Sequence, residues 1–246
     1  MAHRGRDPRA LGAIVGPAAF TTAWVLGTSR RHEGYTITRE HLSGLAAPTA
    51  WRPEIMIGGF LGLGVGTVLF GAALEDALGG VRRAGPGPWL VKTAGVATIA
   101  AGLLRRDHHL LPPLDGEDGH PALVEGQRAT RGKALRGAAD RLGRSAKPLR
   151  KQSWKNDGHD IASGVIYSCL GAAPLFLARR FRDDPEWSRL RGPAIGSAVA
   201  SGVLMALFAT RVVEPWNGIV QRVAVTLPMV AMGAMGAALF LRRPQN

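Results

Sequence analysis

Residues 223–241, VAVTLPMVAMGAMGAALFL, carry no charged side chain and are long enough to cross a lipid bilayer as one helix. A hydrocarbon core of about 30 Å needs about 20 apolar helical residues. Residues 191–212 are similar, because no charge lies between Arg191 and Arg211. The alternation of apolar and polar residues that marks a membrane strand is absent from both stretches. The sequence therefore predicts membrane-spanning helices.

Extended outward along the chain, the same pattern predicts an all-α integral membrane bundle of six transmembrane helices in a single membrane domain, 1–246. A long polar loop, 105–158, separates the third helix from the fourth. Trp24 and polar residues end the first stretch where a signal-peptide cleavage site would stand, so we expect an uncleaved first span. The expected spans are 10–28, 54–78, 89–104, 159–178, 192–210 and 219–240.

The composition of the chain limits the kinds of binding partner and metal site that we expect. The chain has 31 Lys and Arg against 18 Asp and Glu, a net charge of +13. Aromatic residues make up only 6% and no basic nucleic-acid fold is recognisable, so anionic lipid headgroups are favoured over nucleic acid. The single cysteine, Cys169, excludes an intramolecular disulfide and a cysteine-rich metal site. A metal site would use Asp107, His108, His109 and His159. Because the sequence has neither an HExxH motif nor paired CxxC motifs, we predict no metal and no cofactor.

The distribution of arginine predicts the orientation. Six spans place both termini on one side, where the termini and short loops carry twelve arginines against five in the opposite short loops. The positive-inside rule then predicts a multi-pass protein of the cell membrane with cytoplasmic termini. The long loop carries twelve Lys and Arg on the opposite side, but most of them lie far from the membrane ends, where their topological weight falls.

A basic insert, 126–155, forms the second part of the long loop. It holds ten Lys and Arg and one acid, Asp140. Leu135, Leu142 and Leu149 recur at helical spacing and form a thin apolar stripe. One interpretation is a helix that lies on anionic headgroups, and the other is a solvated linker.

Polar motifs gather in the loops that share one membrane face, after spans one, three and five. This asymmetry is the main indication of function. The motifs are Gly34-Tyr35 through His41-Leu42-Ser43, Arg106-Asp107, Asp157-Gly158-His159-Asp160 with Ser163, and Gly218 with Gln221-Arg222.

With these motifs the chain resembles the bacterial membrane family catalogued as domain of unknown function 998, which is distantly similar to damage-regulated autophagy modulators. The resemblance implies six spans but no particular activity. It covers nearly the whole chain except the basic insert, and the sequence has one histidine where members often have two near the fourth span. The matching positions are Gly34-Tyr35…Ser43-Gly44-Leu45, Asp107, His159 and Gly218-Ile219-Val220-Gln221-Arg222.

Asp107, His159 and Asp160 are the candidate catalytic residues. His159 could act as a general base that Asp107 or Asp160 orients. The alternative is helix capping, since carboxylates suit the positive end of a helix. Ser43 lacks a nucleophile elbow and therefore counts as a binding residue.

Arg222 lies near the start of the sixth span and needs a partner there. It is either a clamp for a lipid phosphate, with Gln221 adding hydrogen bonds, or one half of a structural ion pair with Asp107 or Asp160. Candidate residues for binding a lipid or substrate are Tyr35, Ser43, Ser163, Gln221 and Arg222.

Glycine and tryptophan add structural expectations. The second span holds two GxxxG spacings, Gly58–Gly62 and Gly62–Gly66, which favour close helix packing. Six tryptophans near span ends predict an aromatic belt at the membrane interfaces. They are Trp24, Trp51, Trp89, Trp154, Trp187 and Trp216.

Two functions remain open. The first is a protein that binds or organises lipid or another amphiphile at a polar-lined membrane face. The second is a small membrane enzyme that uses acid–base chemistry on a lipid or isoprenoid. A transporter is less favoured, since no pair of broken helices recurs in two halves. Protein partners and the oligomeric state are left open.

Overall fold

The computed structural model describes residues 6–29, 35–108, 153–182, 187–210, 212–213 and 215–241. Within these ranges the regular structure is helical, so the predicted all-α fold is confirmed. Most of the basic insert, Gly34 and His109 lie outside the described residues. The long helices are α1 (Gly12–Ser29), α2 (Pro53–Ala77), α4 (Pro86–Leu103), α6 (Trp154–Phe181), α7 (Ser188–Thr210) and α8 (Asn217–Leu241); the short ones are η1 (Pro8–Leu11), η2 (Leu42–Ala46) and α3 (Val81–Ala84).

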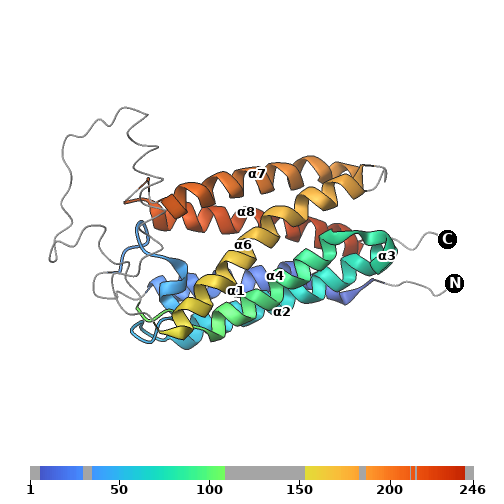
Figure 1. Cartoon of the computed structure of the whole chain (residues 1–246). Coiled ribbons are helices and arrows are strands. Elements are labelled where there is room, and N and C mark those ends of the chain that lie inside the picture. Colours follow the sequence, from blue (N-terminus) through green and yellow to red (C-terminus); the bar gives the residue numbers. More distant parts are fainter. Residues whose placement is uncertain are drawn as a thin grey trace, which may run out of the picture.

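The six long helices form an antiparallel ring in chain order. Each contacts the next, and α8 returns to α1 (Figure 1). Both termini lie at one end of the bundle. We call the opposite end, where residues 35–52 meet the end of α4 and the starts of α6 and α8, the polar end. Helix α6 runs obliquely, so that it meets α7 near the termini and lies away from α7 at the polar end (Figure 1).

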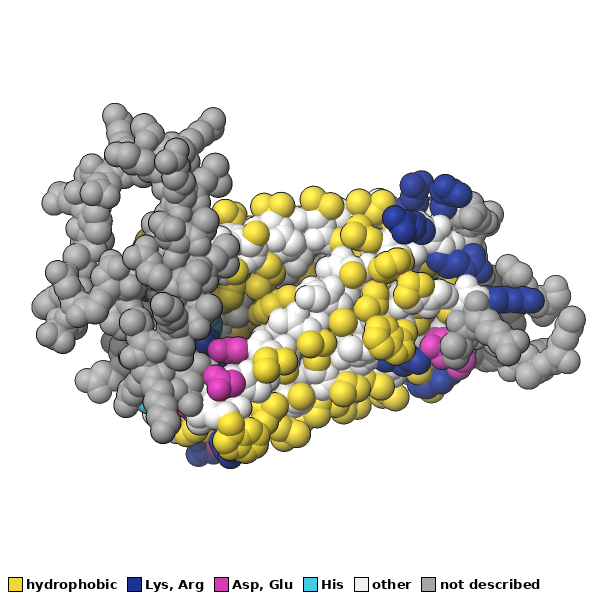
Figure 2. Space-filling view, in the orientation of Figure 1, with side chains coloured by type: hydrophobic (Ala, Val, Ile, Leu, Met, Phe, Trp, Pro, Cys, Tyr) yellow, Lys and Arg dark blue, Asp and Glu magenta, His cyan; other side chains and the backbone are white. Residues whose placement is uncertain are grey.

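The outer surface is that of a membrane-spanning bundle. Five of the six long helices are long and apolar enough to cross a membrane. The exception is α4, which contains Pro86, Pro88 and Lys92 and packs between α2 and α6. Apolar side chains cover the sides of the bundle, and charged side chains gather toward its ends (Figure 2). Exposed valines such as Val65 (50%) and Val230 (64%) belong to these sides.

Helix α6 begins earlier than its apolar stretch predicts. The side chain of Ser153 caps it by accepting a hydrogen bond from the Asn156 amide at 3.3 Å, and Asp157 lies in the first turn. A cap and an acidic first turn stabilise a helix start whatever the hydropathy of the following residues. The helix therefore begins at Trp154, inside the predicted basic insert, rather than at 159.

Glycine allows α1, α2 and α4 to pack closely. A Cβ atom built on Gly66 would lie 2.5 Å from the Gly12 carbonyl oxygen and 2.9 Å from Gly16 Cα. On another side of α2, a Cβ atom on Gly64 would lie 2.7 Å from the Gly95 carbonyl oxygen of α4. Gly58 faces open space, so the first of the two predicted GxxxG spacings is not used between described residues.

Four of the six tryptophans are exposed near helix ends, as expected of an aromatic belt. They are Trp51, Trp89, Trp154 and Trp216, each at least 40% exposed. The expectation is wrong for Trp187. This side chain is only 2% exposed and stacks on Phe181 with ring centroids 5.0 Å apart. Its position just before α7 brings it under the end of α6, so it becomes part of the core instead of an interface anchor.

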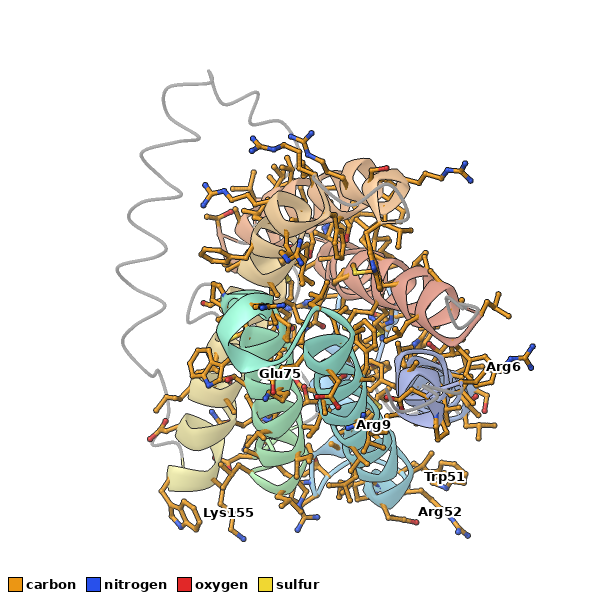
Figure 3. The ribbon with its side chains drawn as sticks, turned by 90° about the vertical axis from the view of Figure 1, so that its right-hand side faces the viewer. Arg6, Arg9, Trp51, Arg52, Glu75 and Lys155 are labelled. Carbon is orange, nitrogen blue, oxygen red and sulfur yellow. The ribbon has the colours of Figure 1, made fainter. Side chains whose placement is uncertain are left out.

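Two ion-pair contacts tie the helices together at the end that carries the termini. Arg9 Nη2 lies 2.7 Å from Asp76, which links η1 to α2. Lys92 Nζ lies 2.7 Å from Glu75, which links α4 to α2. Figure 3 looks onto this end and shows Arg9 and Glu75 among the helices, whereas Arg6 points away.

Replacing Gly66 by alanine should lower the melting temperature of the detergent-solubilised protein, because the new Cβ atom would meet the backbone of α1. Overpacking of this kind costs about 1–3 kcal/mol of unfolding free energy. Gly58→Ala is the matched control, since it changes the same helix at a position with open space. Equal melting temperatures for the two variants would contradict the close packing of α1 on α2.

Candidate functional site

The buried side chain of Arg222 organises the polar end. It projects from the first turns of α8 and is 6% exposed. Its Nη1 donates to the carbonyl oxygens of Ile37 at 2.9 Å and Glu40 at 3.0 Å, and to the Gly218 carbonyl oxygen of its own helix at 2.9 Å. Its Nη2 donates to the Tyr35 hydroxyl at 2.7 Å. The guanidinium thus holds the backbone between α1 and α2 against α8.

Gly218 and Gln221 complete this attachment. A Cβ atom on Gly218 would collide with the Ile37 carbonyl oxygen and lie 2.7 Å from that of Glu40, so only glycine permits this approach. The Gly218 amide donates to the Thr38 carbonyl oxygen at 2.7 Å. Gln221 Oε1 accepts from the Leu42 amide at 2.8 Å. The Gly-x-x-Gln-Arg motif therefore binds the backbone of the preceding loop.

The predicted ion pair between Arg222 and Asp107 is wrong. No described acid lies within ion-pair distance of Arg222, whose partners are carbonyl oxygens and a hydroxyl. Asp107 instead accepts from the Ser153 amide at 2.8 Å and hydroxyl at 2.5 Å. The carboxylate thereby fixes the N-terminal cap of α6. These hydrogen bonds, with Ser153 Oγ the larger cause, hold the pKa of Asp107 below its ordinary value.

The three candidate catalytic residues each have a separate structural partner. His159 is 2% exposed, and its Nδ1 lies 2.7 Å from the Ala101 carbonyl oxygen of α4. Its ring meets the edge of Phe60 at a centroid distance of 6.2 Å. Among the described residues, no hydrogen bond joins His159 to Asp107 or Asp160. The geometry shows a histidine that attaches α6 to α4, without the carboxylate partner expected of a general base.

Asp160 takes part in a different cluster, centred on Arg106 at the end of α4. Arg106 Nη1 contacts His41 Nδ1, and Arg106 Nη2 lies 3.6 Å from the exposed Asp160 carboxylate. Asn156 Nδ2 donates to the same carboxylate at 3.2 Å. The His41 ring also packs against Phe208 of α7, with centroids 4.6 Å apart. The cluster thus joins the loop to α4, α6 and α7.

Tyr35 connects this cluster to α8, and Tyr167 connects α6 to α8; they are the only tyrosines in the chain. The Tyr35 hydroxyl donates to the His41 carbonyl oxygen at 3.2 Å, and burial raises the pKa of Tyr35, which favours the protonated donor. The Tyr167 hydroxyl accepts from Gln221 Nε2 at 3.2 Å. We call this set the polar network; its members are Tyr35, His41, Arg106, Asp160, Tyr167, Gln221 and Arg222.

Three members of the polar network were not predicted as site residues from the sequence: His41, Arg106 and Tyr167. The scarcity of tyrosine was a usable signal for Tyr167, because an aromatic hydroxyl inside a membrane span needs a polar partner. The two candidate serines are less central. Ser43 is buried in η2, and Ser163 is half-buried on α6. Across the described ranges, no three His, Cys, Asp or Glu side chains are grouped as metal ligands would be.

Comparison with known protein families gives one match. The family model described as a protein of unknown function (DUF998) matches residues 14–238. The chain belongs to the DUF998 family. The match runs from α1 into α8, so the whole polar network lies within the DUF998 region, and the resemblance drawn from the short motifs is confirmed. Searches of curated proteins and of solved structures returned no match.

Substituting Arg222 by alanine should destabilise the protein by about 3 kcal/mol, since hydrogen bonds from a charged donor contribute about 1.5–3 kcal/mol each and several are lost. Asp107→Asn should destabilise it independently, because Asp107 serves the cap of α6. Unfolding measurements in detergent should show that the two effects add within about 0.5 kcal/mol in the double variant. A double variant much more stable than this sum would restore the ion-pair hypothesis.

The Asp107–Ser153 contact should depend on pH. A carboxyl group whose pKa is lowered in the folded state stabilises that state above its ordinary pKa of 3.8, and the contribution disappears as the pH falls through the lowered value. Ser153→Ala should therefore reduce the hydrogen-exchange protection of the first turn of α6 at neutral pH, by about 1 kcal/mol for the cap. The difference from wild type should shrink in acid, whereas Ser163→Ala, away from the cap, should show no such pH dependence.

Proposed function

We propose that this membrane-spanning DUF998 protein binds a membrane amphiphile whose polar group meets the polar network and whose apolar chain lies between α6 and α7. One observation carries the proposal: a polar cluster stands at the end of a hydrophobic recess that opens to the side of the bundle. Such a combination suits a ligand with one polar and one apolar end.

The oblique course of α6 creates the recess. Near the termini α6 and α7 are joined through Phe181 and Trp187, and at the polar end the two helices separate (Figure 1). Figure 2 shows a hollow between them whose visible surface is hydrophobic. We call it the α6–α7 recess. Helix α7 is the least covered of the five apolar spans, because only 11% of its apolar stretch is buried inside the bundle. Most of its surface is therefore exposed to lipid.

The polar network supplies the other half of the site. The network reaches the end of α7 through the contact of His41 with Phe208. It reaches the first half of α6 through Asp160 and Tyr167. The polar network therefore contacts both helices that bound the recess. His159 is buried and bonded to the Ala101 carbonyl oxygen, and Asp107 is bonded to Ser153. These separate partners favour binding over acid–base chemistry.

The proposal also includes the orientation of the protein in the membrane and a second contact with lipid headgroups. Arg179, Arg180 and Arg182 lie at the end of α6 nearest the termini, which supports cytoplasmic termini in the cell membrane by the positive-inside rule. The basic insert, 126–155, would add a contact with anionic headgroups, for which its sequence is the support.

The proposal can be tested by photo-crosslinking. The purified protein in nanodiscs would be exposed to equal amounts of phosphatidylcholine and phosphatidic acid that carry a diazirine in the acyl chain. We expect crosslinks concentrated on the facing segments of α6 and α7, residues 163–170 and 204–208, and reduced by excess unlabelled lipid. Val65 and Leu69 of α2, which are 50% and 42% exposed, are the internal control for ordinary lipid contact. Labelling that follows exposure alone and does not saturate would contradict a specific site.

A further inference from the structure

We infer that the polar group bound at the α6–α7 recess is an anion, a phosphate or carboxylate that replaces the Asp160 carboxylate on Arg106. The inference rests on the proposed function and specifies the class of ligand. It is carried by three features of the cluster: an incompletely bonded arginine, an exposed acid beside it, and neutral donors around both.

Arg106 has donor capacity that the described residues leave unused. A guanidinium offers five N–H donors in a planar fork that matches two oxygens of a carboxylate or phosphate. Of these donors, only Nη1 has a hydrogen-bond partner among the described residues, namely His41. Nη2 lies 3.6 Å from Asp160, which is longer than a hydrogen bond. Yet the side chain is only 19% exposed, so water does not fully replace the missing acceptors.

An incoming anion can displace the Asp160 carboxylate from Arg106 at little cost. Its side chain is 47% exposed, so the carboxylate can turn into water without losing its hydration. A partly exposed ion pair without good hydrogen-bond geometry contributes little to stability. By contrast, Asp107 is held by two hydrogen bonds from Ser153 and remains with the cap. The site therefore has one cation with one replaceable counterion.

Neutral donors would surround the incoming anion. Asn156 Nδ2 already donates to the Asp160 carboxylate that the anion would replace. Tyr167 accepts from Gln221, and its own hydroxyl hydrogen has no acceptor among the described residues. Arg222 cannot serve, because its terminal nitrogens are taken by the loop and Tyr35. The arrangement points to a single small oxyanion rather than a zwitterionic headgroup, whose cation would meet Arg106.

Binding measurements in detergent would test this inference. The probes are short-chain phosphatidic acid, phosphatidylcholine with the same acyl chains, and inorganic phosphate. Wild-type protein should bind phosphatidic acid about tenfold more tightly than phosphatidylcholine, as one additional charge-assisted hydrogen-bonded contact provides. Arg106→Gln should abolish this preference while still binding both lipids. Asp160→Asn should strengthen phosphatidic acid binding several-fold. Arg52→Gln, which changes an exposed arginine just before α2 (Figure 3), should alter the affinity for neither lipid.

The outcomes separate the two proposals. Equal affinity of the wild type for the two lipids, or an unchanged preference in Arg106→Gln, would overturn the anion site and leave amphiphile binding standing. Failure of both lipids to bind would overturn the proposed function itself. Competition by millimolar inorganic phosphate as strong as that by phosphatidic acid would identify a free anion as the ligand and overturn the role of the recess. Should Arg106→Gln fail to fold, weaker binding of phosphatidic acid by Asp160→Asn would by itself contradict the exchange of carboxylates.

Discussion

The hydrogen bonds from Arg222 to the backbone between α1 and α2 are the interaction on which the polar end depends. Carbonyl groups removed from water must find donors, and a non-helical segment packed onto membrane helices has few available. Arg222 provides donors to Ile37 and Glu40, while Gln221 provides the acceptor for Leu42. With this segment fixed, His41 is positioned against Arg106 and Phe208, and the remaining network can form.

The two sides of the bundle are built differently, and the difference explains where the proposed amphiphile would have room. Helices α1, α2 and α4 approach so closely at glycine that an added methyl group would strike backbone atoms. On the other side, α6 crosses obliquely, and glycines such as Gly164 and Gly196 have no neighbour within 4 Å of a built Cβ atom. A tightly packed layer thus supports a more open one, and the recess belongs to the open layer.

The candidate site was predictable in location and less so in its contacts. The order of polar motifs relative to the spans placed Tyr35, Asp107, His159 and Arg222 at one end. The structure has them there, before α2 and around the starts of α6 and α8. The partner of Arg222 was not predictable, because sequence patterns point to charged side chains and backbone carbonyl groups have no sequence signature. Asp107 and Ser153 illustrate the same limit: a cap formed by residues 46 positions apart becomes visible only when two helices are brought together.

The sequence by itself determined the membrane character, the antiparallel order of the helices and membership of the DUF998 family, since hydropathy and motif order are properties of the chain alone. Only the tertiary structure decided which surfaces are used. In the folded protein Trp187 is buried, Gly58 faces open space, and Arg106 lies beside His41 and Asp160. The physical reason is that the angle at which a helix packs depends on all its neighbours, and here the oblique course of α6 produced both the recess and the cluster at its end.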